Sequence, residues 1–454
     1  MLEPENNPNP QAMVDPPRIV RFIMARYLSR IVNTKQIRKK RAAFEKRRQA
    51  EQRGHEVEYF HQVDDPYSHL TAQVLARFAE RYDVTIVPHL IRASGGRNQP
   101  EQEKLAVWAR RDVELIAPHY GLEFPAAAGL TPEEGPAEAA LRALANLDTE
   151  RFLSELERIS TATWNGEAVP DEQSVEDVAQ SALERGSARL AELEHYSGAT
   201  FYYGGEWYWG VDRLFHLEQR LRELGACKVP DAPYIVPRPE HDVSGIDASG
   251  LDLHFFPSLN SPYTSIIYDR TIELARACNV RLHHKPVLPM IMRGVPATRA
   301  KGLYILFDTK READFFDVPF GHHVTPIGEP TRSAYSLLPW AAAQGKDCEF
   351  LGTLLRYSWS QGKALHRKAN LRHAVEEAGL DWAEAEKHLG SEDWKAIVEQ
   401  NQDEMVDAMG LWGVPCYKLC GPADEPDLEV WGQDRLWLVA AEIRRRAALR
   451  PATD

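Results

Sequence analysis

Long apolar runs and a leader-like start are both absent from the sequence. No run of eighteen apolar residues occurs, and a membrane-spanning helix needs about that many. Residues 1–4 (MLEP) lack the charged and then apolar order of a secretory signal. We therefore expect a cytoplasmic protein without a membrane span.

Cysteine is scarce, with five residues in a chain of 454. Their number is odd and their spacing is irregular: Cys227, Cys278, Cys348, Cys416 and Cys420. The last two form C-x3-C, which matches neither the C-x-x-C of redox enzymes nor a four-ligand zinc pattern. This usage is typical of reduced thiols in the cytosol, and it predicts no metal site.

Basic residues are in deficit overall, since the net charge is -13, but they are concentrated near the start. Residues 17–53 hold thirteen Lys or Arg against two acids, Glu45 and Glu51. The remainder is strongly acidic, which argues against general nucleic-acid binding. One or two helices are predicted here, after a Pro- and Asn-rich start expected to be disordered. This basic segment either packs on the body as a solvated extension or touches anionic lipid or an acidic partner.

An internal repeat organises the rest of the chain. VEYF and then DPYS (57–68) are echoed by LHFF and then SPYT (253–264), at an offset of 196 residues. The same offset relates Trp108 to Tyr304, Asp112 to Asp308, and Phe124 to Phe320. Near the ends, WGVDRL (209–214) echoes WGQDRL (431–436) at an offset of 222, so the second copy carries 26 more residues. We interpret the chain as two homologous domains.

Four parts follow from this repeat: a disordered start with a basic helical extension (1–54), a first domain (55–226), a linker (227–248) and a second domain (249–447). Each copy has a strand, a helix (66–81; 262–278), a second strand (84–88; 280–284) and a long helical stretch. A hairpin and a final helix (213–224; 435–449) close each copy. This order predicts an α/β protein with two tandem thioredoxin-fold domains, each with a helical insertion.

Five short motifs of the second copy occur in the order of a known family. They are FF (255–256) before SPY (261–263), KPVL (285–288), RAKGLY (299–304) with Asp308, GVP (413–415) and WGQDRL (431–436). In this combination residues 251–445 resemble the glutathione transferase kappa and 2-hydroxychromene-2-carboxylate isomerase family of the DsbA-like thioredoxin superfamily. The resemblance implies two tandem DsbA-like domains, the second one carrying the active site.

The resemblance also implies glutathione as cofactor, with Ser261 as the active-site residue that stabilises its thiolate. The remaining residues implied to bind glutathione or substrate are Pro262, Tyr263, Val414, Pro415, Gln433 and Asp434. The first-turn amides and dipole of a helix favour an anion beside Ser261, and its hydroxyl can donate a hydrogen bond. A cis Pro415 would leave the main chain of Val414 free to pair with a peptide-like ligand.

Plainer roles stay open for the same residues. Ser261 followed by proline is also a good helix N-cap. Pro415 could be an ordinary trans proline in a turn. Gln433 and Asp434 could either take the ends of the ligand or cap the last helix.

The first copy departs from the family pattern. Asp65 stands at the serine position, and SGATF (197–201) replaces the GVP turn. A carboxylate at that helix start would repel a thiolate. We therefore expect a catalytically silent first domain, with Asp65 mainly a cap, that serves as a built-in partner. The chain would be a monomer with an internal pseudo-dimer, or a homodimer.

Three functions compete on this basis. The leading one is a glutathione-dependent isomerase or transferase acting on a small aromatic or conjugated substrate. The second is a thiol-disulfide oxidoreductase, against which Ser261 and Thr264 argue because neither can form a disulfide. The third is a non-catalytic binding or scaffold protein.

Overall fold

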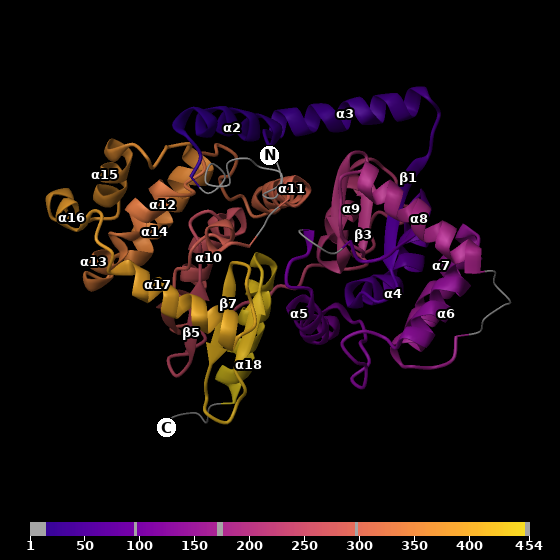
Figure 1. The fold of residues 1–454 in the computed structure, drawn as a ribbon. Helices are drawn as coiled ribbons and strands as arrows, with labels where there is room; N and C mark the ends of the chain where they lie inside the picture. The colour runs from indigo at the N-terminus through magenta and orange to yellow at the C-terminus, as the bar shows by residue number, and fades with distance from the viewer. Residues whose placement is uncertain (1–14, 95–97, 170–175, 296–297, 450–454) are drawn as a thin grey trace. The chain divides into compact units, whose positions relative to one another are not determined.

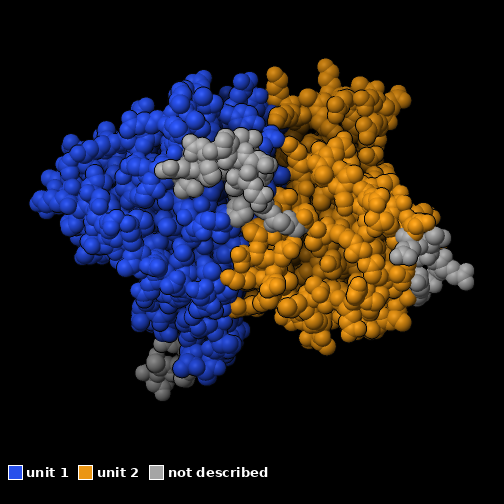
Figure 2. Space-filling model, in the orientation of Figure 1, with its two compact units in different colours: residues 1–37, 240–454 blue, residues 38–239 orange. Residues whose placement is uncertain are grey.

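The computed structural model describes residues 15–94, 98–169, 176–295 and 298–449 (Figure 1). The chain divides into two compact units, coloured separately in Figure 2. Unit 1 takes residues 1–37 and 240–454, and unit 2 takes residues 38–239. Most of the Pro- and Asn-rich start predicted to be disordered, residues 1–14, lies outside the described residues.

Unit 2 contains a four-stranded sheet with the order β2-β1-β3-β4. The pair β1–β2 is parallel, and β1–β3 and β3–β4 are antiparallel. The strands are β1 (His55–Gln62), β2 (Val84–Ile91), β3 (Thr200–Tyr203) and β4 (Glu206–Trp209). The helices are α4 (Pro66–Arg81), α5 (Gln102–Ile116), α6 (Glu134–Ala145), α7 (Thr149–Trp164), α8 (Glu176–Glu192) and α9 (Gly210–Glu223), with a short 3-10 turn, η3 (Ala117–Tyr120).

Unit 1 contains a second four-stranded sheet, with the order β6-β5-β7-β8. Its strands are β5 (Asp252–Phe256), β6 (Arg281–His284), β7 (Cys416–Cys420) and β8 (Leu428–Trp431). Its helices after β5 are α10 (Pro262–Ala277), α11 (Arg299–Phe315), α12 (Glu329–Tyr335), α13 (Leu338–Ala343), α14 (Asp347–Arg356), α15 (Lys368–Glu377), α16 (Trp382–His388), α17 (Trp394–Asp403) and α18 (Leu436–Ala448). Short 3-10 turns are η4 (Met290–Arg293) and η7 (Gln433–Arg435), and π-helical turns are η5 (Tyr357–Gln361) and η6 (Glu404–Ala408).

The two sheets share one strand order and one pattern of pairing, with a parallel pair followed by two antiparallel pairs. A matching hydrogen bond lies beside each sheet. Tyr67 Oη donates to Asp112 Oδ2 at 2.7 Å, and Tyr263 Oη donates to Asp308 Oδ2 at 2.8 Å. Each tyrosine is in the first turn of a helix, and each aspartate is almost fully buried. These pairs agree with the repeat read from the sequence, while a second DsbA-like domain in unit 2 stays a prediction.

The central strands are largely buried on both faces. On β5, Leu253, Phe255 and Phe256 are fully buried. The Phe255 ring stacks on Tyr417 of β7 with ring centroids 5.2 Å apart. A strand buried on both faces reads as a near-continuous apolar run rather than as an alternation. This explains why LHFF and VEYF stand out in the sequence.

The basic extension forms two helices, α2 (Arg18–Ile31) and α3 (Thr34–Ala50). α2 packs on unit 1, because Arg21 is 2% exposed and donates to the Thr325 carbonyl at 3.1 Å. The Ser29 hydroxyl also accepts from the His323 amide at 3.0 Å. Large apolar side chains remain exposed on α2: Ile19, Val20, Phe22, Ile23 and Tyr27. Packing on the body therefore holds for α2, and contact with lipid or an acidic partner stays a prediction.

Most of α3, residues 38–50, belongs to unit 2. There Arg41 pairs with Glu206 at 2.6 Å. The unit boundary thus falls inside the segment that the sequence marked as one extension. The other boundary, after Pro239, falls inside the predicted linker. None of the described helices is long and apolar enough to cross a membrane.

We predict that Tyr67→Phe and Tyr263→Phe each destabilise their own unit. Each change removes one hydrogen bond to a buried carboxylate, a loss of about 1.5–3 kcal/mol. Urea unfolding followed by tryptophan fluorescence would measure the change. Tyr27→Phe is the control, because Tyr27 is 51% exposed. Equal stability of all three variants would show that the buried pairs contribute nothing.

Candidate functional site

Ser261 caps the N-terminus of α10, as the sequence predicts. Its Oγ accepts a hydrogen bond from the Thr264 amide at 3.1 Å, and Pro262 occupies the first helical position. The side chain is 7% exposed. Its hydroxyl donates to the Val414 carbonyl at 3.4 Å, a long contact that a better acceptor could replace. The same position of the Ser261 hydroxyl, at the start of α10, therefore fits both the role of helix cap and the proposed contact with a ligand.

The GVP turn lies directly beside this cap. The Val414-Pro415 peptide bond is cis, as predicted, and so is Gly421-Pro422. Val414 and Pro415 are buried. Among the described residues, no partner takes the Val414 amide hydrogen. That main-chain donor and the Ser261 hydroxyl are thus adjacent polar groups.

Gly413 lies close against an aromatic ring. A Cβ added there would come within 2.0 Å of the Trp431 indole, so a larger residue cannot occupy this position without a shift. The Gly432 amide donates to the Pro415 carbonyl at 2.9 Å, which attaches the WGQDRL motif to the turn. The SPY motif therefore meets, at one end of the sheet, the GVP turn and the WGQDRL motif, which lie more than 150 residues further along the chain.

Gln433 is held inside unit 1. It is 3% exposed, and its Nε2 donates to Glu312 Oε2 of α11 at 2.9 Å. Its Oε1 is buried and has no partner among the described residues. Asp434 is partly exposed, and its carbonyl accepts from Arg435 at 3.1 Å. The N-cap residue of α18 is Arg435, whose side chain makes no capping hydrogen bond, and Gln433 Oε1 caps no amide.

Tyr263 does not present a free hydroxyl. Its Oη is committed to Asp308, whose other carboxylate oxygen pairs with Arg311 at 3.2 Å. The side chain is partly exposed. Its ring can still border a ligand, whereas its hydroxyl supports the packing of α10 on α11.

Asp65 occupies the corresponding cap in unit 2. Its carboxylate accepts from the Ser68 amide at 2.9 Å, from the Ser68 hydroxyl at 2.8 Å and from the Tyr67 amide at 3.4 Å. Burial outweighs these hydrogen bonds and raises the pKa of Asp65 to about 6. Asp65 is therefore a cap, as predicted; catalytic silence of this unit remains a prediction.

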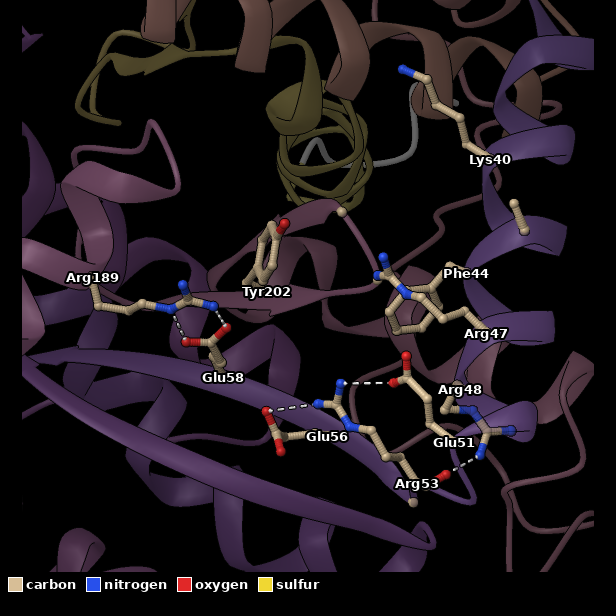
Figure 3. A pocket seen from close by; sticks show the side chains of 14 residues that line it. Lys40, Phe44, Arg47, Arg48, Glu51, Arg53, Glu56, Glu58, Arg189 and Tyr202 are labelled. Carbon is tan, nitrogen blue, oxygen red and sulfur yellow. Dashed lines mark hydrogen bonds and ion pairs between the residues drawn. The ribbon is translucent and has the colours of Figure 1, made fainter.

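A cavity of about 680 Å³ lies elsewhere in unit 2, between α3, β1 and β3 (Figure 3). Its lining includes the basic side chains of Lys40, Arg47, Arg48, Arg53 and Arg189, with Phe44 and Tyr202. Arg189 holds Glu58 at 2.7 Å, and Arg53 lies between Glu51 and Glu56. Asp65 is not part of this lining. The sequence showed that residues 17–53 are rich in Lys and Arg, but it did not predict a cavity there.

The two adjacent histidines of β6 have separate partners. His283 pairs with Asp252, and His284 Nδ1 pairs with Asp347 Oδ2, each at 2.6 Å. Adjacent residues of a strand point to opposite faces, which is why the two rings do not share one partner. Sequence spacing did not indicate that Cys348 lies near His284. Ligand-type atoms of His284, Asp347 and Cys348 lie within 4.8 Å of one another, the one such group among the described residues.

Comparison with known proteins supports the fold of unit 1. Residues 252–444 match the model of the DSBA-like thioredoxin domain, which is less than half of the chain. The search of curated proteins found no match. Residues 252–444 therefore form a DsbA-like thioredoxin domain.

Several solved structures are similar to part of the chain. A 2-hydroxychromene-2-carboxylate isomerase is 19% identical, with TM-score 0.36, and the match covers 44% of this chain and 100% of that one. A probable DsbA oxidoreductase from Streptomyces coelicolor is 16% identical, with TM-score 0.34, covering 45% and 93%. The cytosolic disulfide reductase DsbM from Pseudomonas aeruginosa is 18% identical, with TM-score 0.32, covering 43% and 98%. Likenesses at this level do not identify a function.

We predict that Asp65 makes unit 2 less stable as the pH rises. The folded pKa is about 6 against an ordinary 3.8, so the folded state binds more protons between these values. The contribution of this group is therefore complete below about pH 4 and lost by about pH 6. Asp65→Asn keeps a capping oxygen and should remove this decline. Urea midpoints measured across that range for both proteins provide the test; parallel curves would contradict it.

Proposed function

We propose that unit 1 is a glutathione-dependent isomerase or transferase that acts on a small aromatic or conjugated substrate. One observation carries the proposal: the Ser261 hydroxyl lies at the N-terminus of α10, 3.4 Å from the Val414 carbonyl. The serine lies 153 residues before Val414 of the GVP turn, and the WGQDRL motif follows that turn on the next strand. The family that unit 1 resembles uses these motifs together, and here they meet.

The polar groups at this place fit a peptide-like thiol. The Ser261 hydroxyl can donate to a sulfur anion, and the dipole of α10 favours a negative charge at that point. The Val414 amide can donate to a main-chain carbonyl of the ligand, as in strand addition. The buried Gln433 Oε1 lacks a partner among the described residues and can accept from an ammonium group.

When bound, glutathione supplies the nucleophilic sulfur that adds to a conjugated substrate. The Ser261 hydroxyl stabilises the negative charge on that sulfur by a hydrogen bond and does not itself attack the substrate. Pro262 fixes the first turn so that the amides that follow are oriented toward the sulfur. Ser261 would serve an isomerase and a transferase alike, because both need the thiolate held at the start of α10.

Two other functions remain as alternatives. A thiol-disulfide oxidoreductase needs cysteine at the helix start, and Ser261 and Thr264 hold those positions. A non-catalytic binding protein would bind its ligand through the same polar groups but would not convert it. Insulin reduction tests the first alternative, and glutathione binding without turnover would favour the second.

We predict that Ser261→Ala lowers glutathione-dependent turnover by roughly 10²-fold, the usual effect of losing one preorganised donor. The lost N-cap should cost only about 1 kcal/mol of stability, so the protein should remain folded. Turnover with 2-hydroxychromene-2-carboxylate or an aryl halide, and circular dichroism, measure the two effects.

Asp65→Ala is the matched control, because it removes the equivalent cap from the unit expected to be silent. Its turnover should equal that of the wild type. Unchanged turnover in Ser261→Ala would remove Ser261 from the mechanism, and a large loss in Asp65→Ala would show that unit 2 is functional.

A further inference from the structure

The large apolar side chains of α2 face solvent. Ile19 is 65% exposed, Ile23 is 60% exposed and Phe22 is 56% exposed, and Tyr27 and Val20 follow at 51% and 39%. Each of the five lies three or four positions from another, so they form one broad face of the helix, which we call the α2 patch. Single exposed apolar residues are common, but a contiguous group of this kind marks a surface that contacts another molecule.

The opposite face of α2 holds the helix against unit 1. Arg21 is almost fully buried there, donates to the Thr325 carbonyl at 3.1 Å and pairs with Asp15 at 2.7 Å. Leu28 is partly buried, and Val32, just after the helix, is fully buried. An ordinary surface helix buries its apolar face, whereas α2 buries an arginine and turns its apolar face outward.

Positive charges share the exposed face with the α2 patch. Arg18, Arg26 and Arg30 are all exposed. The Arg26 guanidinium lies 5.7 Å from the centre of the Phe22 ring, so cationic and apolar groups adjoin. No acid occurs in residues 16–44 of a chain whose net charge is -13. This face therefore offers apolar and cationic groups and no anionic ones.

The surface of an anionic lipid bilayer is complementary to this combination. Apolar side chains can enter the boundary between headgroups and acyl chains, while long arginine side chains reach the phosphates. Each Lys or Arg close to an anionic membrane strengthens binding by about fivefold. Residues 35–40, which follow α2 in the sequence, add four exposed Lys or Arg. The chemistry of this region thus favours lipid as the occupant.

A second copy of the chain fits the α2 patch less well. A symmetric pair would place α2 against α2 of the other copy, and arginine would then face arginine with no acid to compensate. A different apolar patch would be needed otherwise. In the part of the chain that the structure describes, the remaining exposed large apolar residues occur singly: Val107, Leu130, Val229, Phe315, Ile397 and Leu449.

We propose that α2 is an interfacial helix that binds the surface of an anionic lipid bilayer, with the α2 patch at the headgroup boundary and its arginines at the phosphates. α2 has 14 residues, so it would lie in the plane of the membrane, because a helix that spans one needs about 20. Binding would bring the DsbA-like domain of unit 1 to the lipid. The proposal does not depend on Ser261 or on the proposed function.

Sedimentation of the full-length protein with lipid vesicles tests the proposal. The protein should pellet with vesicles made of equal parts phosphatidylcholine and phosphatidylglycerol, and it should stay in the supernatant with phosphatidylcholine alone. Added salt should release it, because salt screens the charges. Failure to pellet with the anionic vesicles at low salt, or equal binding to both kinds of vesicle, would overturn the proposal.

Two double variants separate the apolar and the charged contributions. Phe22→Ser with Ile23→Ser should lower the partition coefficient by at least about tenfold, because two apolar side chains no longer leave water. Arg26→Gln with Arg30→Gln should lower it by about 25-fold, since two charges are lost.

Matched controls remove the same types of side chain elsewhere in unit 1. Ile397→Ser changes an isoleucine of α17 that is 46% exposed, and Arg276→Gln changes an arginine of α10 whose side chain is 70% exposed. Both should bind vesicles like the wild type. If the double variants of α2 also bind like the wild type, the assignment to α2 is wrong.

The other occupants have their own signatures. A wild-type dimer in gel filtration that Phe22→Ser with Ile23→Ser makes monomeric, together with no vesicle binding, would assign the α2 patch to a second copy and overturn the proposal. Retention on immobilised polyglutamate without vesicle binding would assign it to an acidic protein. Circular dichroism reports whether each variant is folded, and the comparison of the two kinds of vesicle needs no variant.

Discussion

The antiparallel pairing of β5 with β7 determines which groups can meet at the start of α10. Phe256 lies opposite Cys416, so the chain after β5 and the chain before β7 share one edge of the sheet. Cys416 in turn pairs with Trp431, which places β8 beside β7. The Gly432 amide can then donate a hydrogen bond to the Pro415 carbonyl. A slip of one residue in either register would turn every side chain to the opposite face. It would also separate the Ser261 hydroxyl from Val414.

Local signals in the sequence were enough to predict the elements that begin at caps. The helix predicted over 66–81 is observed with those bounds, and the one predicted over 262–278 ends at Ala277. Each follows a capping side chain and a proline, which act within one turn. The last helix was predicted from Arg435, but a 3-10 turn over 433–435 delays its start to Leu436.

Contacts between distant segments could not be read in the same way. The hydrogen bond from Gln433 to Glu312 spans 121 residues, and the bond from His284 to Asp347 spans 63. No periodicity or motif encodes such pairs, because they depend on how α11 and α14 pack. For the same reason Cys348 looked like an isolated cysteine. The motif positions were recognised, and the partners of their side chains were not.

The cap residue differs between the two units, whereas the hydrogen bond beside it is the same in both. Both units retain a first-turn tyrosine bonded to a buried aspartate. At the cap itself, the Asp65 carboxylate accepts from two amides, whereas the Ser261 hydroxyl accepts from one. A carboxylate thus brings its own negative charge to the helix start, and a serine leaves that position to another anion. The fold and the proposed anion site are therefore separable at this residue.

The buried Arg21 has a consequence for how the protein is made. Its carbonyl partner, Thr325, lies 304 residues further along the chain. At 5–20 residues per second, a ribosome needs roughly 15–60 s to complete that stretch. Throughout this interval Arg21 of the nascent α2 lacks the Thr325 carbonyl, while all of residues 38–239 emerge. α2 therefore leaves the ribosome long before the carbonyl partner of Arg21, and a chaperone has that whole interval in which to bind it.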